Sequence, residues 1–199
     1  MTSGNAGKRE HKGTIRGYES PDREGRRSDG RGPKDIGPAS GLTMAESFND
    51  RALLIGASLA QLAMTGRAVT IHERPGLERC LFDIKSDGVT ASVLFKYSTR
   101  RKSPWYFTVG REQFEALRDR APTLPLSRRY FALVCHTDGV CLISLEDFLE
   151  IVKVKRAESQ WGLSVSRPQS SSYRVSGPGR ESLGRTIARS RWTTEFFET

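Results

Sequence analysis

The fold is decided by residues 80–96, which read CLFDIKSDGVTASVLFK. Asp87 and Gly88 stand between two runs in which side chains alternate, and an Asp-Gly pair at that place is typical of a two-residue hairpin turn. With this pair at the turn centre, Ser86 faces Val89 and the register of both strands follows. The predicted pairs are Ile84 with Ala91, Phe82 with Val93 and Cys80 with Phe95 on an apolar face, and Lys85 with Thr90, Asp83 with Ser92, Leu81 with Leu94 and Arg79 with Lys96 on the other.

Further elements are predicted on both sides of this hairpin. Thr43 and Glu46 form a capping box, and the apolar residues after it recur at helical spacing, which predicts an amphipathic helix that ends near Thr65 and Gly66. Strands are predicted at 69–72, 105–109, 129–136, 140–143, 161–167 and 172–177, and helices at 111–120 and, behind a cap of Ser144 and Asp147, from Leu145. This order indicates an α/β (α+β) fold with a mixed, largely antiparallel sheet flanked by about three helices.

Composition divides the chain of 199 residues into three parts. Residues 1–41 hold nine of the 19 glycines and few large apolar side chains, so they cannot bury enough surface to offset the entropy of ordering. We expect this segment to be a disordered, basic, glycine-rich tail. Residues 42–158 are expected to form the α/β core domain, and residues 159–199 a basic β-hairpin with an irregular extension packed on the core.

A dense group of cations follows the predicted hairpin, and the whole chain carries a formal net charge of +9. The group consists of Lys96, Arg100, Arg101 and Lys102, interleaved with hydroxyl side chains and with aromatic residues that include Trp105. Guanidinium and ammonium groups bind phosphates, and aromatic rings stack on bases, so this mixture predicts a nucleic-acid contact. The alternative is a solvated loop in which Trp105 anchors the following strand in the core.

A second group of cations lies near the C-terminus. Residues 161–192 contain six arginines against Glu181 alone. Four of these arginines join the predicted nucleic-acid-binding residues: Arg167, Arg174, Arg185 and Arg189. For any single arginine, the alternative is a basic strand edge that discourages association between sheets.

The order of elements over residues 43–143, with Asp83 on one strand and Lys96 on the next, resembles the core of the PD-(D/E)xK nuclease-like fold. This resemblance implies a Mg²⁺ site made by one acid and an acid-x-Lys motif. Asp83 matches the first acid and Lys96 the lysine, but Leu94 stands where the second acid belongs. It therefore implies a catalytically degenerate, nucleic-acid-binding derivative, with an active Mg²⁺-dependent nuclease as the alternative. The run from Lys96 to Phe107 is also similar to that of uncharacterised bacterial proteins.

A weaker catalytic candidate is the pair of His136 and Cys141. A turn centred on Asp138 and Gly139 would place this histidine opposite the cysteine, where it could activate the thiol. The alternative is an ordinary half-buried sheet face. The three cysteines have no CxxC spacing, so we predict no disulfide framework and no metal site, and no cofactor apart from Mg²⁺ under the nuclease alternative.

Together these patterns favour a nucleic-acid-associated protein whose partner is DNA or RNA, and they favour binding over catalysis. Two alternatives stay open: the metal-dependent nuclease that uses Asp83, and an accessory module that binds a protein partner. No stretch of the sequence is long and apolar enough to cross a bilayer, and its first forty residues lack the apolar segment of a secretory signal. We therefore expect a cytoplasmic protein without a membrane partner.

Overall fold

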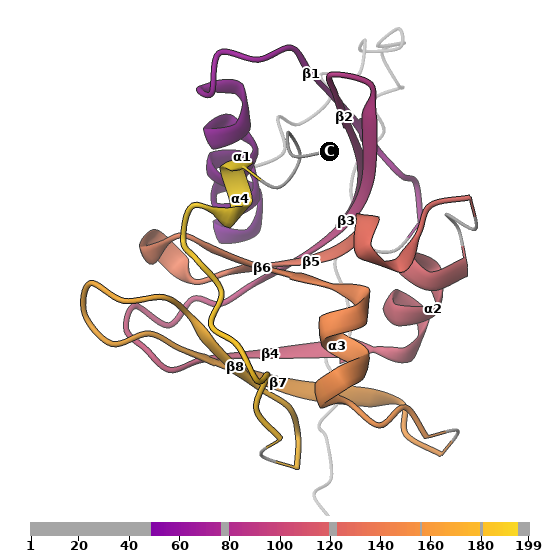
Figure 1. Ribbon diagram of the computed structural model, residues 1–199, viewed down its shortest axis with the longest axis vertical. Coiled ribbons are helices and arrows are strands. Elements are labelled where there is room, and N and C mark those ends of the chain that lie inside the picture. Colours follow the sequence, from indigo (N-terminus) through magenta and orange to yellow (C-terminus); the bar gives the residue numbers. More distant parts are fainter. Residues whose placement is uncertain (1–48, 77–79, 120–122, 156, 180, 195–199) are drawn as a thin grey trace, which may run out of the picture. The chain divides into compact units, whose positions relative to one another are not determined.

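The computed structural model describes residues 49–76, 80–119, 123–155, 157–179 and 181–194, all within one compact unit, Ala45–Thr199. The expected tail at residues 1–41 and the capping box of Thr43 and Glu46 lie outside these residues. The order of elements is α1 (Asp50–Ala63), β1 (Val69–Glu73), β2 (Leu81–Ser86), β3 (Val89–Tyr97), β4 (Trp105–Gly110), α2 (Arg111–Asp119), η2 (Leu126–Arg128), β5 (Arg129–Val134), η3 (His136–Asp138), β6 (Val140–Ser144), α3 (Leu145–Ile151), β7 (Gln160–Ser166), β8 (Arg174–Ser176) and α4 (Arg191–Thr194) (Figure 1).

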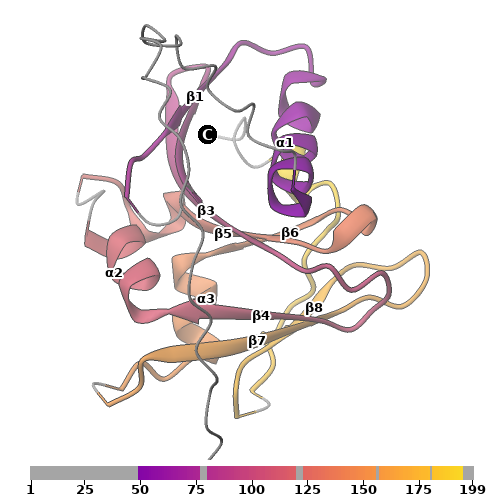
Figure 2. The same cartoon turned by 180° about the vertical axis from the view of Figure 1, so that it is seen from behind.

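The strands form two sheets, and the fold is α+β as predicted. The first sheet has the order β1-β2-β3-β5-β6, and all its neighbours are antiparallel except β3 and β5, which run parallel. The second sheet, β4-β7-β8, is antiparallel throughout. The chain leaves the first sheet after β3 and enters the second at β4, so the loop between them joins the two sheets (Figures 1 and 2).

The central hairpin has the predicted register from Leu81 opposite Leu94 to Ser86 opposite Val89. Asp87 and Gly88 both have positive φ angles, of 49° and 81°. Positive φ at both central residues defines the mirror-image type I turn, whose twist matches that of the flanking strands. The turn chemistry of two residues therefore sets the pairing of the whole hairpin.

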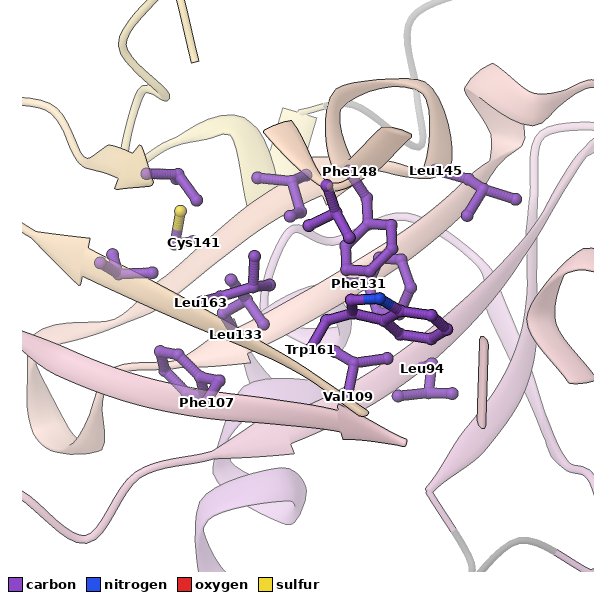
Figure 3. Close-up of a cluster of buried hydrophobic side chains, with 14 of the residues drawn as sticks. Leu94, Phe107, Val109, Phe131, Leu133, Cys141, Leu145, Phe148, Trp161 and Leu163 are labelled. Atoms are coloured by element: carbon purple, nitrogen blue, oxygen red, sulfur yellow. The ribbon is translucent and has the colours of Figure 1, made fainter. Parts of the chain in front are cut away.

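Two hydrophobic cores lie on opposite faces of the first sheet. One packs that sheet against α1 and includes Trp192 of α4. The other fills the space between the two sheets, and Phe131, Phe148 and Trp161 meet in it (Figure 3). Strand β5 contributes to both cores, because its alternate side chains point to opposite faces. All six of its residues are buried, as expected of a central strand.

Helix α1 begins later than predicted. The side chain of Asn49 accepts a hydrogen bond from the backbone N–H of Ala52, so this asparagine is the N-cap. The helix ends where expected, with Gly66 at φ 77°. Of the helices in the described ranges, none is both long and apolar enough to cross a bilayer.

The predicted boundary between residues 158 and 159 passes through the second sheet. Strand β7 pairs along its length with β4, from Trp105 opposite Val165 to Gly110 opposite Gln160. The two β strands that follow the boundary thus complete a sheet that begins before it. The segments on both sides of that boundary consequently belong to one compact unit.

Candidate functional site

The β3–β4 loop, residues 98–104, carries the densest cluster of exposed cations among the residues predicted to bind nucleic acid. Trp105 is only 2% exposed, and its indole N–H donates to the carbonyl of Arg100 at 2.8 Å. The interpretation of Trp105 as a base-stacking residue is therefore wrong, and the alternative of a core anchor is confirmed. This anchor holds the loop while the side chains of Arg100, Arg101 and Lys102 remain exposed.

A hollow of about 390 Å³ lies beside this loop, between the start of α1, the end of β3 and the edge strand β4. Cations, hydroxyls and one amide line it together with apolar side chains, and none of its described lining residues is a carboxylate. The lining residues are Arg51, Ile55, Cys80, Phe95, Lys96, Tyr97, Tyr106, Phe107, Thr108 and Gln113. A cation-lined hollow without an acid favours an anionic ligand.

Arg51 brings a positive charge to this hollow. Its terminal nitrogen Nη2 is buried and has no hydrogen-bond partner among the described residues. A guanidinium stays charged at any ordinary pH, and a buried donor left unsatisfied costs about 1–3 kcal/mol. An oxyanion in the hollow would be attracted by the charge of Arg51, which is one of the lining residues.

Lys96 supplies a second cation whose position is set by neighbouring groups. Its Nζ donates to Oε1 of Gln113 at 3.0 Å, and the same oxygen accepts from the backbone N–H of Gly110 at 3.1 Å. Gln113 thereby ties the end of β3 to the start of α2. The amide orients the ammonium group without neutralising its charge.

Two tyrosines connect the hollow with the basic loop. Tyr97 is 38% exposed and Tyr106 is 59% exposed, although both side chains line the hollow. The guanidinium of Arg100 lies over the ring of Tyr106, 5.6 Å from its centroid. Aromatic surface and positive charge therefore lie together at the point where the loop meets the hollow.

A second hollow, of about 520 Å³, adjoins the first along β4. The two hollows share Lys96, Thr108 and Gln113. The second also contains Arg111, whose guanidinium donates to the carbonyl of Glu158, and the carboxylate residue Glu112. The guanidinium of Arg111 is thus already bound to the backbone, and a carboxylate lies in the same lining. The first hollow is therefore the better site for an anion.

Three C-terminal arginines pair with buried or half-buried acids. Nε of Arg167 donates to Asp138 at 2.7 Å, and the hydroxyl of Tyr173 donates to the same carboxylate at 3.0 Å. Arg185 and Arg191 both bind Asp147, the second of them at 3.1 Å. These arginines dock the C-terminal segment on the rest of the unit.

The pKa values of the two acids agree with these contacts. The Arg167 guanidinium, followed by the Tyr173 hydroxyl, holds the pKa of Asp138 below its usual range, although burial acts in the opposite direction. Burial also disfavours the charged form of Asp147, but the backbone N–H of Ser144 and the two arginines outweigh it and lower the pKa. Both aspartates are therefore ionised at neutral pH.

The other two predicted C-terminal cations are exposed but lie away from the hollow beside the loop. Arg174 is on β8, and β7 separates that strand from β4. Arg189 lines a different hollow, of about 650 Å³, with Gln61 and several serines. Of the predicted nucleic-acid-binding residues, the structure brings together Lys96 and the three loop cations, but not Arg174, Arg185 and Arg189. Arg167 adjoins the loop, since its backbone N–H donates to the hydroxyl of Ser103 at 3.0 Å, but its side chain pairs with Asp138.

Sequence reasoning missed Arg51, although the sequence contains a signal for it. Arg51 precedes Ile55 by four residues, and Leu62 follows at helical spacing. An arginine in line with the apolar stripe of an amphipathic helix faces the protein and not the solvent. Such a residue needs an internal partner or a ligand, which distinguishes it from the arginines of the loop.

The residues that resemble a nuclease motif do not converge in the structure. The carboxylate of Asp83 accepts hydrogen bonds from Arg74 and from the hydroxyl of Ser92, the latter at 2.6 Å. Lys96 follows Ser92 by four residues on β3, which corresponds to about 13 Å along a strand. Within the described ranges, no three His, Cys, Asp or Glu side chains are grouped so that they could hold a metal ion.

The predicted pairing of His136 with Cys141 is wrong. Cys141 pairs with Leu133, and the chain between the strands forms the short helix η3 and a hydrogen bond from Cys135 N–H to the Gly139 carbonyl. The loop is thus longer than a two-residue turn, and its Asp138 binds Arg167 of the C-terminal segment. Cys141 is fully buried, and burial raises the pKa of its thiol, so it is unsuited to nucleophilic attack.

Comparison with known proteins gives no match: no family model, no curated protein and no solved structure is similar to this chain. The resemblance to the PD-(D/E)xK nuclease-like fold therefore stays a prediction. The function has to be inferred from the geometry of the hollow and the loop.

Proposed function

We propose that this protein binds nucleic acid through the loop–hollow surface, defined as the β3–β4 loop together with the hollow beside it. The observation that carries the proposal is the hollow beside the loop, which Arg51 and Lys96 line and whose described lining residues include no carboxylate. The charged residues of the surface are Arg51, Lys96, Arg100, Arg101 and Lys102. They come from α1, β3 and the loop, so folding gathers charges that are separated in the sequence.

The chemistry of this surface matches that of a phosphodiester chain. Arginine forks and a lysine point charge contact phosphate oxygens, and hydroxyls of Tyr97 and Thr108 add directional donors. The exposed face of Tyr106 offers a platform for a base. A small anionic metabolite would use the hollow alone, whereas a polyanion also uses the three cations of the adjoining loop.

Binding is favoured over hydrolysis by the surroundings of Asp83. Arg74 and Ser92 already occupy its carboxylate oxygens, and Lys96 lies farther along β3. A metal-dependent nuclease needs several oxygen ligands around one ion close to the phosphate. We therefore propose a role that depends on retention of the nucleic acid and not on its cleavage.

The test measures binding of a fluorescent oligonucleotide of about 16 nucleotides by anisotropy, at about 50 mM and 200 mM salt. The triple variant Arg100→Gln/Arg101→Gln/Lys102→Gln should bind at least about 10-fold more weakly at the lower salt concentration, with a shallower salt dependence, because three phosphate contacts are lost. The matched control is Arg174→Gln/Arg185→Gln/Arg189→Gln, which removes the same charge elsewhere and should retain most of the affinity. No binding at low salt, or equal loss in both variants, would overturn the proposal.

A further inference from the structure

The recessed position of the Arg51 guanidinium restricts which nucleic acids can reach it. Arg51 lines a hollow of about 390 Å³, a size within the usual range for sites that enclose a small ligand. A duplex is a stiff rod over tens of base pairs, and its phosphates lie along its outer ridges. A single strand bends at each nucleotide and can place one phosphate inside the hollow.

The exposed tyrosines restrict the ligand in the same way. More than half of Tyr106 is exposed, and the Arg100 guanidinium lies 5.6 Å from the ring centroid. In a duplex, both faces of each internal base are covered by its neighbours, so a protein ring outside the helix gains no stacking. An unpaired base can stack on such a ring, and this contact tolerates any base.

Lys96 connects the recessed phosphate position with the aromatic surface. It lies on β3 directly before Tyr97, and both side chains line the hollow with Arg51 and Tyr106. The hydrogen bond of its Nζ to Gln113, at 3.0 Å, sets the position of the ammonium group. Within one hollow, two cations and two tyrosines thus offer the partners that one nucleotide needs for its phosphate and its base.

We infer that the loop–hollow surface is specific for single-stranded nucleic acid. The phosphate of one unpaired nucleotide binds Arg51 and Lys96, its base stacks on Tyr106, and the neighbouring phosphates contact the cations of the β3–β4 loop. This inference rests on the proposed function and adds to it the class of nucleic acid that the surface selects.

The test compares a single strand with the duplex of the same sequence in anisotropy titrations of the full chain at about 100 mM salt. The single strand should bind at least about 10-fold more tightly than the duplex. Tyr106→Ala should weaken single-strand binding by about 10-fold and leave duplex binding unchanged, since only an unpaired base uses the ring. Tyr106→Phe is the matched control and should retain the affinity, because the π face remains.

A second variant probes the phosphate position. Arg51→Gln should reduce single-strand affinity by about 10-fold and lower the slope of log affinity against log salt by somewhat less than one unit, as for one lost phosphate contact. Its circular dichroism spectrum and melting temperature would show that the fold is intact.

The outcomes separate this inference from the proposed function. If the protein binds neither single strand nor duplex, the proposed function itself fails. If the duplex binds as tightly as the single strand, or if Tyr106→Ala weakens both equally, nucleic-acid binding stands and the single-strand specificity is wrong. Displacement of the strand by poly-glutamate at equal charge concentration would also overturn the inference, because stacking would then contribute nothing.

Discussion

Two regions of this molecule contain several arginines, and the two groups of arginines differ in whether acidic side chains surround them. In the C-terminal segment, residues 161–194, Arg167 pairs with Asp138, and two further arginines pair with Asp147. In the loop–hollow surface, the described lining of the hollow contains no acid, and Arg51 keeps a buried nitrogen without a partner in the described part of the chain. The surroundings of the cations therefore differ between the two regions, and a count of cations alone does not show this difference.

The paired arginines hold the last part of the chain in place. This segment runs from the second sheet past β6 to α1, as both views of the ribbon show (Figures 1 and 2). At its end, the indole of Trp192 is buried in the core between α1 and the first sheet and donates to the carbonyl of Ser58 at 2.9 Å. The arginines of this segment thus stabilise the fold, whereas those of the loop–hollow surface are the ones that we propose bind a ligand.

The largest effect should come from Asp147, the buried acid of α3 that binds two arginines of the C-terminal segment. Asp147→Asn keeps an oxygen that can accept from the backbone N–H of Ser144, but it removes the negative charge that pairs with Arg191, whose side chain is 13% exposed. Breaking a buried ion pair from one side should lower the free energy of unfolding by about 3 kcal/mol, as measured by urea denaturation.

The control for this variant removes the exposed partner of the same acid. The side chain of Arg185 is 56% exposed, so Arg185→Gln should cost less than about 1 kcal/mol because water screens the pair. If the two variants lost equal amounts of the free energy of unfolding, the stabilising role of the Asp147 pairs would not depend on burial, and this prediction would be wrong. Neither variant should change nucleic-acid affinity by more than the small effect of one distant charge.

A smaller and pH-dependent effect is expected at Asp138. Its pKa is lowered in the folded protein, chiefly by Arg167, so its contribution to stability is present above the ordinary aspartate pKa of 3.8 and is lost as the pH falls through the lower folded value. Asp138→Asn should therefore cost about 1–2 kcal/mol at pH 6, and the gap between the two proteins should narrow as the pH falls below about 4.

The measurement is the free energy of unfolding of both proteins by urea between about pH 6 and pH 3. Subtraction of the two curves removes the contribution of Asp147, which also titrates in this range. A difference that stays constant across the range would show that the Asp138 carboxylate does not contribute through its charge.

The smallest expected effect is an increase in the free energy of unfolding, and it comes from a substitution in the loop–hollow surface. Arg51→Met removes the buried unpartnered donor and keeps an unbranched apolar side chain beside Ile55. We expect the free energy of unfolding to rise by about 1 kcal/mol, because an unsatisfied buried polar group is replaced by an apolar one. A melting temperature below that of the parent protein would show instead that Arg51 stabilises the fold and would remove the contrast between the two regions.

The sequence predicted the elements whose signals are local. The Asp87-Gly88 turn set the register of β2 and β3, and the cap of Ser144 and Asp147 is present as a complete capping box. The Asp138-Gly139 pair wrongly predicted a two-residue turn. Asp138 lies in the short helix η3 and is bound by Arg167, 29 residues away in the sequence. A local turn signal holds only where no distant partner competes for the same side chain.

The candidate site was predictable only in part. The loop cations and Lys96 form a run of charge in the sequence. Trp105 was grouped with them as a nucleic-acid-binding residue, because a core anchor and a base-stacking residue have the same sequence pattern. The four C-terminal arginines were grouped with them because their places in the folded chain do not follow from the sequence: the acidic partners of Arg167 and Arg185 lie 29 and 38 residues away. Arg51 was not predicted as a site residue, because a single cation in a helix does not form a cluster of charge in the sequence.

The amino-acid sequence by itself determined the order of helices and strands, the central hairpin and the excess of positive charge, since these depend on neighbouring residues and on composition. Only the tertiary structure decided that β4 leaves the first sheet to pair with β7, and which arginines meet an acid. Both depend on contacts between residues far apart in the chain, such as Trp192 and Ser58, 134 positions apart. Such contacts arise from the packing of whole elements, which no local pattern encodes.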